Sequence, residues 1–175
     1  MKEGIKIAVS GKSGCGNSTV SSLVAERLGL RMINYTFHTM AEEMNINFKE
    51  LCELAEEDPK YDRHLDRKQV QLAEEGNCVL GSRLAIWMLE DADLKVYLEA
   101  PVEVRARRIQ DREGGSYEKV LAETRERDRR DTERYRRLYN IDNNEYAFAD
   151  LILDVSELDQ YKAAEAVIRE AEKIR

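Results

Sequence analysis

The sequence contains little cysteine, little proline and no long apolar run. Its 175 residues include three Cys and two Pro. Cys15, Cys52 and Cys78 are far apart and form no C-x-x-C pair, which excludes a zinc module of that spacing and argues against a disulfide framework. Two prolines leave little room for a linker. We therefore expect one domain in a reducing, cytoplasmic environment.

Two further absences argue against a membrane-spanning protein and against general nucleic-acid binding. No apolar run approaches the roughly 20 residues of a membrane span, and the first residues do not resemble a signal peptide. There is no excess of basic residues, because 28 Lys and Arg against 35 Asp and Glu give a net charge of −7. General nucleic-acid binding relies on a basic surface. Hydrophobic residues reach 42%, so a buried core is expected.

The charge is unevenly distributed along the chain. From Pro101 to Tyr139 there are eleven Arg and one Lys against nine acids, an excess of +3, whereas the remaining residues carry −10. A solvated helix with alternating charges explains this stretch, and charge alone favours that interpretation. Arginines gathered to bind a polyanion are the alternative. Only the rest of the chain decides between them.

Short apolar segments alternate with helical patterns. Asn47 with Glu50 predicts a capped helix start, Gly29 and Gly76 predict helix ends, and Pro101 predicts a first helical position. Expected strands cover 5–9, 32–33, 78–80, 94–98 and 151–153, and expected helices cover 18–28, 47–58, 61–75, 116–139 and 163–174, with one more from 101. This order predicts an α/β fold with a doubly wound parallel five-stranded sheet.

A glycine-rich loop follows the first expected strand. Its sequence, Gly11-Lys12-Ser13-Gly14-Cys15-Gly16-Asn17-Ser18-Thr19, runs directly into a helix, the setting of a phosphate-binding loop. Ser18 falls where a hydroxyl binds Mg²⁺ between phosphates. A tight turn without a ligand is the alternative. Asn17 stands where the motif has Lys, so we hypothesise that Lys12, the cation inside the loop, compensates in part.

With this loop and the segments that follow it, the sequence resembles the nucleoside monophosphate kinases, and most closely the cytidylate kinases of the archaeal type. The resemblance covers nearly the whole chain, in the segments 5–30, 54–59, 62–69, 92–95, 100–109, 123–135 and 139–142. It implies a single P-loop NTPase domain over 1–175, with a helical monophosphate-binding part over 34–76 and a lid helix over about 114–140. The implied reaction converts ATP and CMP (or dCMP) to ADP and CDP with Mg²⁺. We expect a cytoplasmic enzyme, and a monomer in preference to an oligomer.

The resemblance also implies roles for individual residues. The expected ATP-binding residues are Gly11, Lys12, Ser13, Gly14, Cys15, Gly16, Asn17, Ser18, Thr19 and Arg108, with Ser18 also holding Mg²⁺. The expected monophosphate-binding residues are Arg83, Arg112, Arg127 and His38. The expected catalytic residues are Lys12, Asn17, Arg129 and Arg134. For each arginine a surface ion pair is the alternative, and Arg125, Arg136 and Arg137 are read as solvated charges.

Three details refine these expectations. Arg129 and Arg134 are five residues apart, so a break or rotation in the lid would help both to converge on one phosphate. Asp128 and Asp131 are expected to orient arginines. Cys15 lies near a helix N-terminus, which favours its thiolate, and its redox role stays open.

The chain departs from the family pattern within the site. Besides Asn17, the family's Glu-Gly-Arg appears as Gly81-Ser82-Arg83, and the segment 34–39 is shortened and lacks the family's Arg. His38 replaces that cation only when protonated, and a lone His is more often structural. A weakened or inactive nucleotide-binding protein, acting as a sensor or partner, is therefore the alternative function. An RNA-binding module built on the Arg-rich helix is a third reading, against which the dense Asp and Glu argue.

Overall fold

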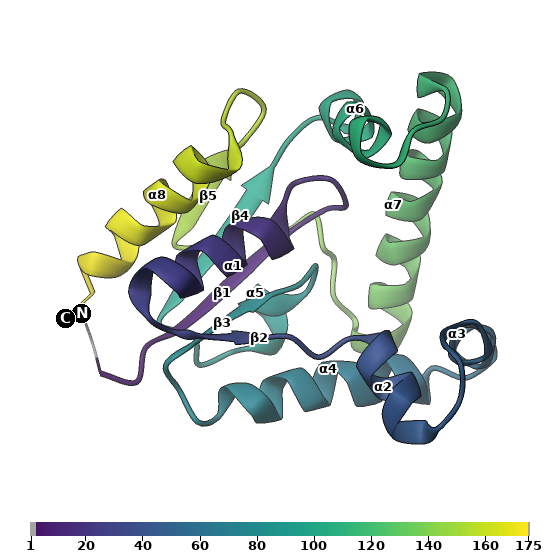
Figure 1. Ribbon diagram of the computed structural model, residues 1–175, viewed down its shortest axis with the longest axis horizontal. Coiled ribbons are helices and arrows are strands. Elements are labelled where there is room, and N and C mark those ends of the chain that lie inside the picture. Colours follow the sequence, from purple (N-terminus) through teal and green to yellow (C-terminus); the bar gives the residue numbers. More distant parts are fainter. Residues whose placement is uncertain (1–2, 175) are drawn as a thin grey trace.

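Five short strands form one parallel sheet in the order β2-β3-β1-β4-β5 (Figure 1). This computed structural model describes residues 3–174. The strands are β1 (Lys6–Gly11), β2 (Arg31–Ile33), β3 (Cys78–Gly81), β4 (Leu94–Glu99) and β5 (Leu151–Asp154). The chain fills one side of β1 first and the other side later, so the sheet is doubly wound, as the sequence predicts. The carboxyl ends of β3 and β4 flank that of β1, where α/β folds of this kind bind ligands.

Helices cover both faces of the sheet because the central strands are apolar on both sides. On one face, α1 (Asn17–Leu28) and α8 (Gln160–Glu172) pack on Ile7 and Val9. On the other, α4 (Lys60–Ala73) and α5 (Ala85–Met88) pack on Ala8 and Leu80. Full burial of such side chains contributes about 1.5–3 kcal/mol for each Val, Leu or Ile. The central strands are therefore a rigid base for the loops at their ends.

Four more helices lie beyond the carboxyl ends of the strands (Figure 1). They are α2 (Phe37–Met44), α3 (Phe48–Glu57), α6 (Val102–Glu113) and α7 (Tyr117–Tyr139). The pair α2 and α3 packs around buried Met40 and Leu51, and α6 packs on α7 through Ile109 and Val120. None of the helices within residues 3–174 combines the length and apolar composition that crossing a bilayer requires.

Several local predictions are confirmed and several are wrong. The side chain of Asn47 accepts a hydrogen bond from the Glu50 amide, and Gly29 ends α1 in the left-handed conformation. Helices α2 and α5 are not expected from the sequence, because both are short. Pro101 is not the first helical residue but the N-cap of α6. The lid has no break that would help Arg129 and Arg134 to converge, since α7 runs continuously from Tyr117 to Tyr139.

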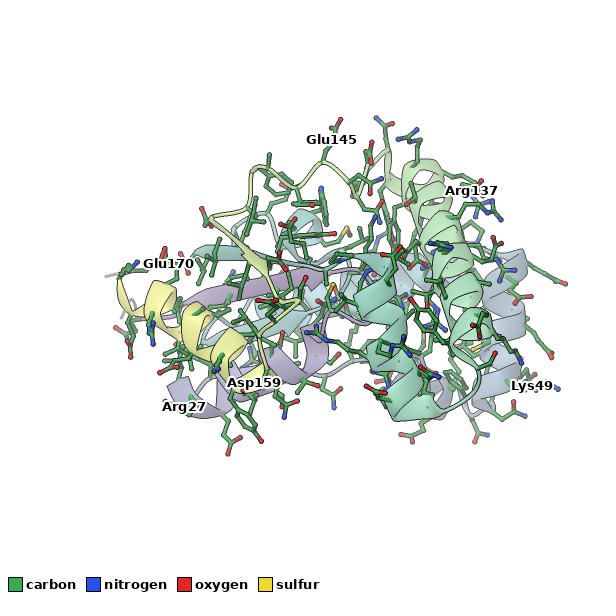
Figure 2. All side chains as sticks on the ribbon, turned by 90° about the horizontal axis from the view of Figure 1, so that it is seen from above. Arg27, Lys49, Arg137, Glu145, Asp159 and Glu170 are labelled. Atoms are coloured by element: carbon green, nitrogen blue, oxygen red, sulfur yellow. The ribbon has the colours of Figure 1, made fainter. Side chains whose placement is uncertain are left out.

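The outer face of α7 agrees with the first reading of this charged stretch, a solvated helix with alternating charges. Its outer face carries exposed ion pairs, such as Arg130 with Glu126 and Lys119 with Glu123. Its inner face buries Asp131 and Tyr135 against the rest of the molecule. Arg137 is exposed and lies at the edge of the molecule, in agreement with its reading as a solvated charge (Figure 2).

Candidate active site

The loop between β1 and α1 presents backbone N–H groups at a helix start. Gly14 and Gly16 both have a φ of 88°, a conformation that favours glycine. Gly16 is the N-cap of α1, and no side chain of the described residues forms a capping hydrogen bond at this helix end. The first amides of α1 are therefore available to an anion, which the helix dipole also favours. A Cβ on Gly14 would lie 2.9 Å from the backbone of Arg105, so this glycine also allows close packing on α6.

A cavity of about 860 Å³ opens in front of this loop. Its other walls come from α6, α7 and the segment that joins β5 to α8, including Asp159 at the start of α8 (Figure 2). The expected site residues on its wall are Lys12, Ser13, Gly14, Cys15, Gly16, Asn17, Ser18, Thr19, Arg83, Arg108, Arg112 and Arg127. Gly11 lies just behind them as the last residue of β1. The cavity has the size of a small-molecule site. Its wall is mainly basic, because it includes one Lys and four Arg and, of the described acidic residues, Asp159 alone.

The arginines around this cavity have different local partners. The guanidinium of Arg108 donates to the carbonyl oxygens of Val155 and Leu158, and so holds the segment between β5 and α8. Arg127 donates to Ser13 Oγ at 3.1 Å, which joins α7 to the loop. Arg112 is exposed, and its guanidinium pairs with the neighbouring Glu113 at 3.1 Å. Arg112 is thus the most readily reoriented of the three.

Asn17 turns back onto its own loop. Its Nδ2 donates to the carbonyl oxygen of Gly11 at 2.6 Å, while its Oδ1 is buried and has no hydrogen-bond partner among residues 3–174. The side chain therefore closes the loop on the end of β1 and brings no positive charge. Lys12 Nζ donates to Asn144 Oδ1 at 2.7 Å, and it forms no ion pair with any residue of 3–174. Its charge is available to a ligand.

A second cavity, of about 430 Å³, adjoins the first. The two share Ser82 and Arg83 on their walls. Helices α2, α3, α4 and α7 enclose the second cavity, which contains His38 and Arg134 among the expected residues. The His38 ring stacks on Phe48 with centroids 3.8 Å apart. Arg83 therefore lies at the junction of two adjacent sites.

Ion pairs join arginines and carboxylates at the second cavity, whose wall includes Arg83, Arg134, Asp62 and Asp66 but not the buried Asp131. Asp131 lies 3.3 Å from Arg83 and 3.2 Å from Arg134, as expected for a residue that orients arginines. Arg134 also lies 3.7 Å from Asp62. Burial raises the pKa of Asp62, and the nearby Arg134 opposes that shift. Burial likewise raises the pKa of Asp66 to about 6, although the Tyr139 hydroxyl donates to this carboxylate.

The structure does not bring Arg129 to either cavity. Its guanidinium lies 2.7 Å from Glu126 and 2.8 Å from Glu133 on the outer face of α7, and the side chain is 55% exposed. Because α7 is continuous, Arg129 and Arg134 face different directions. Their expected convergence does not occur in this arrangement.

Sequence reasoning missed one residue that ties the parts of the site together. Arg105 is 5% exposed and forms a bidentate ion pair with Asp128, at 2.7 and 3.0 Å. It also donates to the carbonyl oxygens of Ser13 and Ala100. Arg105 thus connects the loop, β4 and α7. The available signal was its position four residues before buried Ile109, on the inward face of α6, where a charge requires a partner.

Sequence reasoning also missed the acidic wall of the second cavity. The available signal was the spacing of Asp62 and Asp66, four residues apart and hence on one face of the predicted helix. Cys15 differs from expectation too. It is 3% exposed, and burial raises the pKa of its thiol to about 11, which disfavours the thiolate despite the helix start. Cys15 is therefore a packing residue of the loop.

The residues present fit a magnesium ion that arrives with a nucleotide. No group of three or more His, Cys, Asp or Glu within 3–174 forms a metal site. Mg²⁺ usually takes one or two protein ligands and completes its shell with substrate phosphates and water. Ser18 lies on the cavity wall in the first turn of α1, next to the loop that would hold those phosphates. A hydroxyl at this place matches such a shared site.

Comparison with known proteins agrees with this geometry. The model of the cytidylate kinase-like family matches residues 6–157. A cytidylate kinase 2 of Borreliella afzelii (strain PKo) is 49% identical over 97% of this chain and 97% of its own length. A cytidylate kinase of Pyrococcus horikoshii is 41% identical over 89% of this chain and 82% of its own length.

Solved structures match the fold at lower identity. A shikimate kinase from Bacteroides thetaiotaomicron has a TM-score of 0.62 and 18% identity, covering 97% of this chain and 96% of its own. A deoxyadenosine kinase from M. mycoides with bound dATP has a TM-score of 0.56 and 18% identity, covering 96% of this chain and all of its own. At these identities the likeness shows the P-loop kinase fold alone.

Proposed function

Because the chain belongs to the cytidylate kinase-like family, we propose that it transfers the γ-phosphoryl group of ATP to CMP or dCMP. An oxygen of the monophosphate attacks the γ-phosphorus, the bond from that phosphorus to the β,γ-bridging oxygen breaks, and ADP and CDP (or dCDP) are released. One observation carries this proposal: the cavity walled by the glycine loop adjoins a second cavity, and Arg83 lies on the wall of both.

The first cavity suits ATP. Loop amides and the start of α1 provide donors for phosphate oxygens, and Lys12 adds positive charge beside them. Arg112 and Arg127 line this first cavity and not the second, so we assign them to the ATP phosphates and not to the monophosphate for which the resemblance predicts them. Mg²⁺, held by Ser18 and the phosphates, would neutralise charge that develops during transfer. Arg108 keeps the segment between β5 and α8 in place as the wall beside the adenine base.

The second cavity suits the monophosphate. Arg83 and Arg134 give it a cationic end, and Asp131 holds both guanidinium groups. Planar guanidinium groups bind phosphate oxygens in pairs, so this end positions the attacking oxygen. The ring of His38, stacked on Phe48, lines the same cavity, where an imidazole N–H adds a donor. Segment 34–76 provides the helical part that grips the substrate, and segment 114–140 provides the lid.

Positive charge in this site comes from the arginines more than from the loop. Phosphoryl transfer depends on positioning and on neutralising charge. Asn17 contributes none, and its role is to close the loop through Gly11. A catalytic role for Arg129 requires a rearrangement of α7 that frees it from Glu126 and Glu133. We further propose a cytoplasmic monomer.

The test is a coupled assay of ADP release with ATP, Mg²⁺ and each of CMP, dCMP, UMP and AMP. We expect the highest kcat/KM with CMP or dCMP, and no turnover with any of the four would refute the proposal. Arg83→Ala should lower kcat/KM at least 100-fold, because it removes a charge from the transferring group. Arg130→Ala is the matched control, since this exposed side chain pairs with Glu126 outside both cavities and should leave the rate unchanged.

A further inference from the structure

The second cavity has a cationic end and an anionic end. From the junction with the first cavity, ion pairs run from Arg83 through Asp131 to Arg134 and then to Asp62. Asp66 follows Asp62 by one turn of α4 and lines the same cavity as Arg83 and Arg134. A nucleoside whose phosphate is bound at Arg83 and Arg134 would therefore lie within the cavity that Asp66 lines.

The Asp66 carboxylate has acceptor capacity that the protein leaves unused. The Tyr139 hydroxyl donates to its Oδ2, and no Lys, Arg or His within residues 3–174 forms an ion pair with it. Its Oδ1 has no hydrogen-bond partner among the same residues. The surrounding wall includes the apolar side chains of Leu65 and Leu138. The Oδ1 oxygen can therefore accept a hydrogen bond from an N–H group of a ligand in the cavity.

From this geometry we infer that Asp66 selects the base of the acceptor by accepting a hydrogen bond from the exocyclic amino group of cytosine. The inference rests on the proposed function. Cytosine presents an amino donor at C4, whereas a pyrimidine with a carbonyl there presents an acceptor. An ionised carboxylate can only accept hydrogen bonds, so a uracil base would place its C4 carbonyl oxygen, also an acceptor, against the Asp66 carboxylate. Tyr139 is the positioning residue that holds the carboxylate.

The inference is tested by kcat/KM for CMP and UMP in the wild type and in Asp66→Asn. The asparagine keeps an oxygen that accepts from Tyr139, and its amide adds a donor for the uracil carbonyl. We expect the ratio of CMP to UMP to fall by roughly 10- to 100-fold, the loss that follows removal of a hydrogen bond to a charged group. An unchanged ratio overturns the inference while leaving the kinase function in place.

Asp62→Asn is the matched control, with the same substitution one turn away. Asp62 is paired with Arg134, so we expect the KM values for CMP and UMP to change together and their ratio to stay constant. A fall in the ratio equal to that of Asp66→Asn assigns the effect to the general charge of the cavity and overturns the inference.

A change in the substrate tests the same contact without relying on a variant. The CMP analogue with hydrogen in place of the amino group at C4 removes the donor and adds no bulk. Wild-type protein should use or bind it about 10-fold or more weakly than CMP, and Asp66→Asn should discriminate far less. Equilibrium binding of CMP, UMP and the analogue gives the base preference without turnover, so failure of catalysis is distinguishable from failure of base selection. Equal affinities for CMP and the analogue in the wild type overturn the inference.

Discussion

The Asn17 amide donates to the carbonyl oxygen of Gly11 at 2.6 Å, so the residue at the expected lysine position binds the protein instead of facing the phosphates. We predict that Asn17→Lys raises kcat about 10-fold, because it adds a charge where the transferred group becomes more negative. The measurement is the ADP-release assay at saturating ATP and CMP. Asn17→Ala is the control, as it breaks the Gly11 contact without adding charge and should lower the rate. A rate for Asn17→Lys at or below that of Asn17→Ala would falsify this explanation.

Lys12 should carry part of the charge that Asn17 lacks. We predict that Lys12→Ala raises the Kd for ATP and lowers kcat, each about 10-fold, because the loop then holds no cation. Titration calorimetry and the ADP-release assay measure the two effects. Asn144→Ala removes only the partner of Lys12, at 2.7 Å, and should leave kcat within about twofold. If affinity and turnover survive Lys12→Ala, the compensation hypothesis fails.

The ion pair between Arg105 and Asp128 should stabilise the fold more than the exposed pairs do. Arg105→Ala leaves Asp128 with an uncompensated charge in a site where the arginine is 5% exposed. Removal of one partner of a buried pair costs about 3–5 kcal/mol of unfolding free energy. Urea denaturation followed by circular dichroism measures this loss. Arg125→Ala, whose pair with Glu103 is exposed, should leave the midpoint unchanged. Equal midpoints for the two variants would contradict the prediction.

Asp66 should make the protein less stable as the pH rises. Its pKa is raised by burial from 3.8 to about 6, with the Tyr139 hydrogen bond opposing the shift and the Asp62 and Arg134 charges nearby. Between these two pKa values the unfolded chain has lost the proton that the folded protein retains, so the free energy of unfolding falls as pH rises. This group then contributes a loss of about 1.4 kcal/mol from pH 5 to pH 8. Asp66→Asn should lack this contribution, and urea unfolding at both pH values measures it. Parallel losses in the variant and the wild type would speak against the assignment.

Sequence patterns were sufficient to predict the structural features that depend on residues close together along the chain. The apolar run before Gly11, the spacing from Gly11 to Thr19 and the Asn47 cap each determine a local conformation, and each was correctly anticipated. The first cavity follows from them, because parallel strands end at one edge of the sheet.

Features that depend on distant partners were not accessible in the same way. Tyr139 and Asp66 are separated by 73 residues, and Arg105 and Asp128 belong to different helices. Helical periodicity indicates which face a residue occupies but not which side chain it meets there. The same limit applies to Arg129, for which the resemblance implies a catalytic role. Its guanidinium pairs with Glu126 and Glu133 on the outer face of α7, away from both cavities.

The place of Arg83 on the walls of both cavities has a kinetic consequence. One guanidinium that contacts two ligands links their binding free energies, and such linkage is reciprocal. The KM for ATP should therefore depend on the concentration of the monophosphate, and the KM for the monophosphate on ATP by the same factor when binding is at equilibrium. A substitution at Arg83 then weakens this mutual dependence as well as each affinity, so its effect cannot be divided between the two substrates.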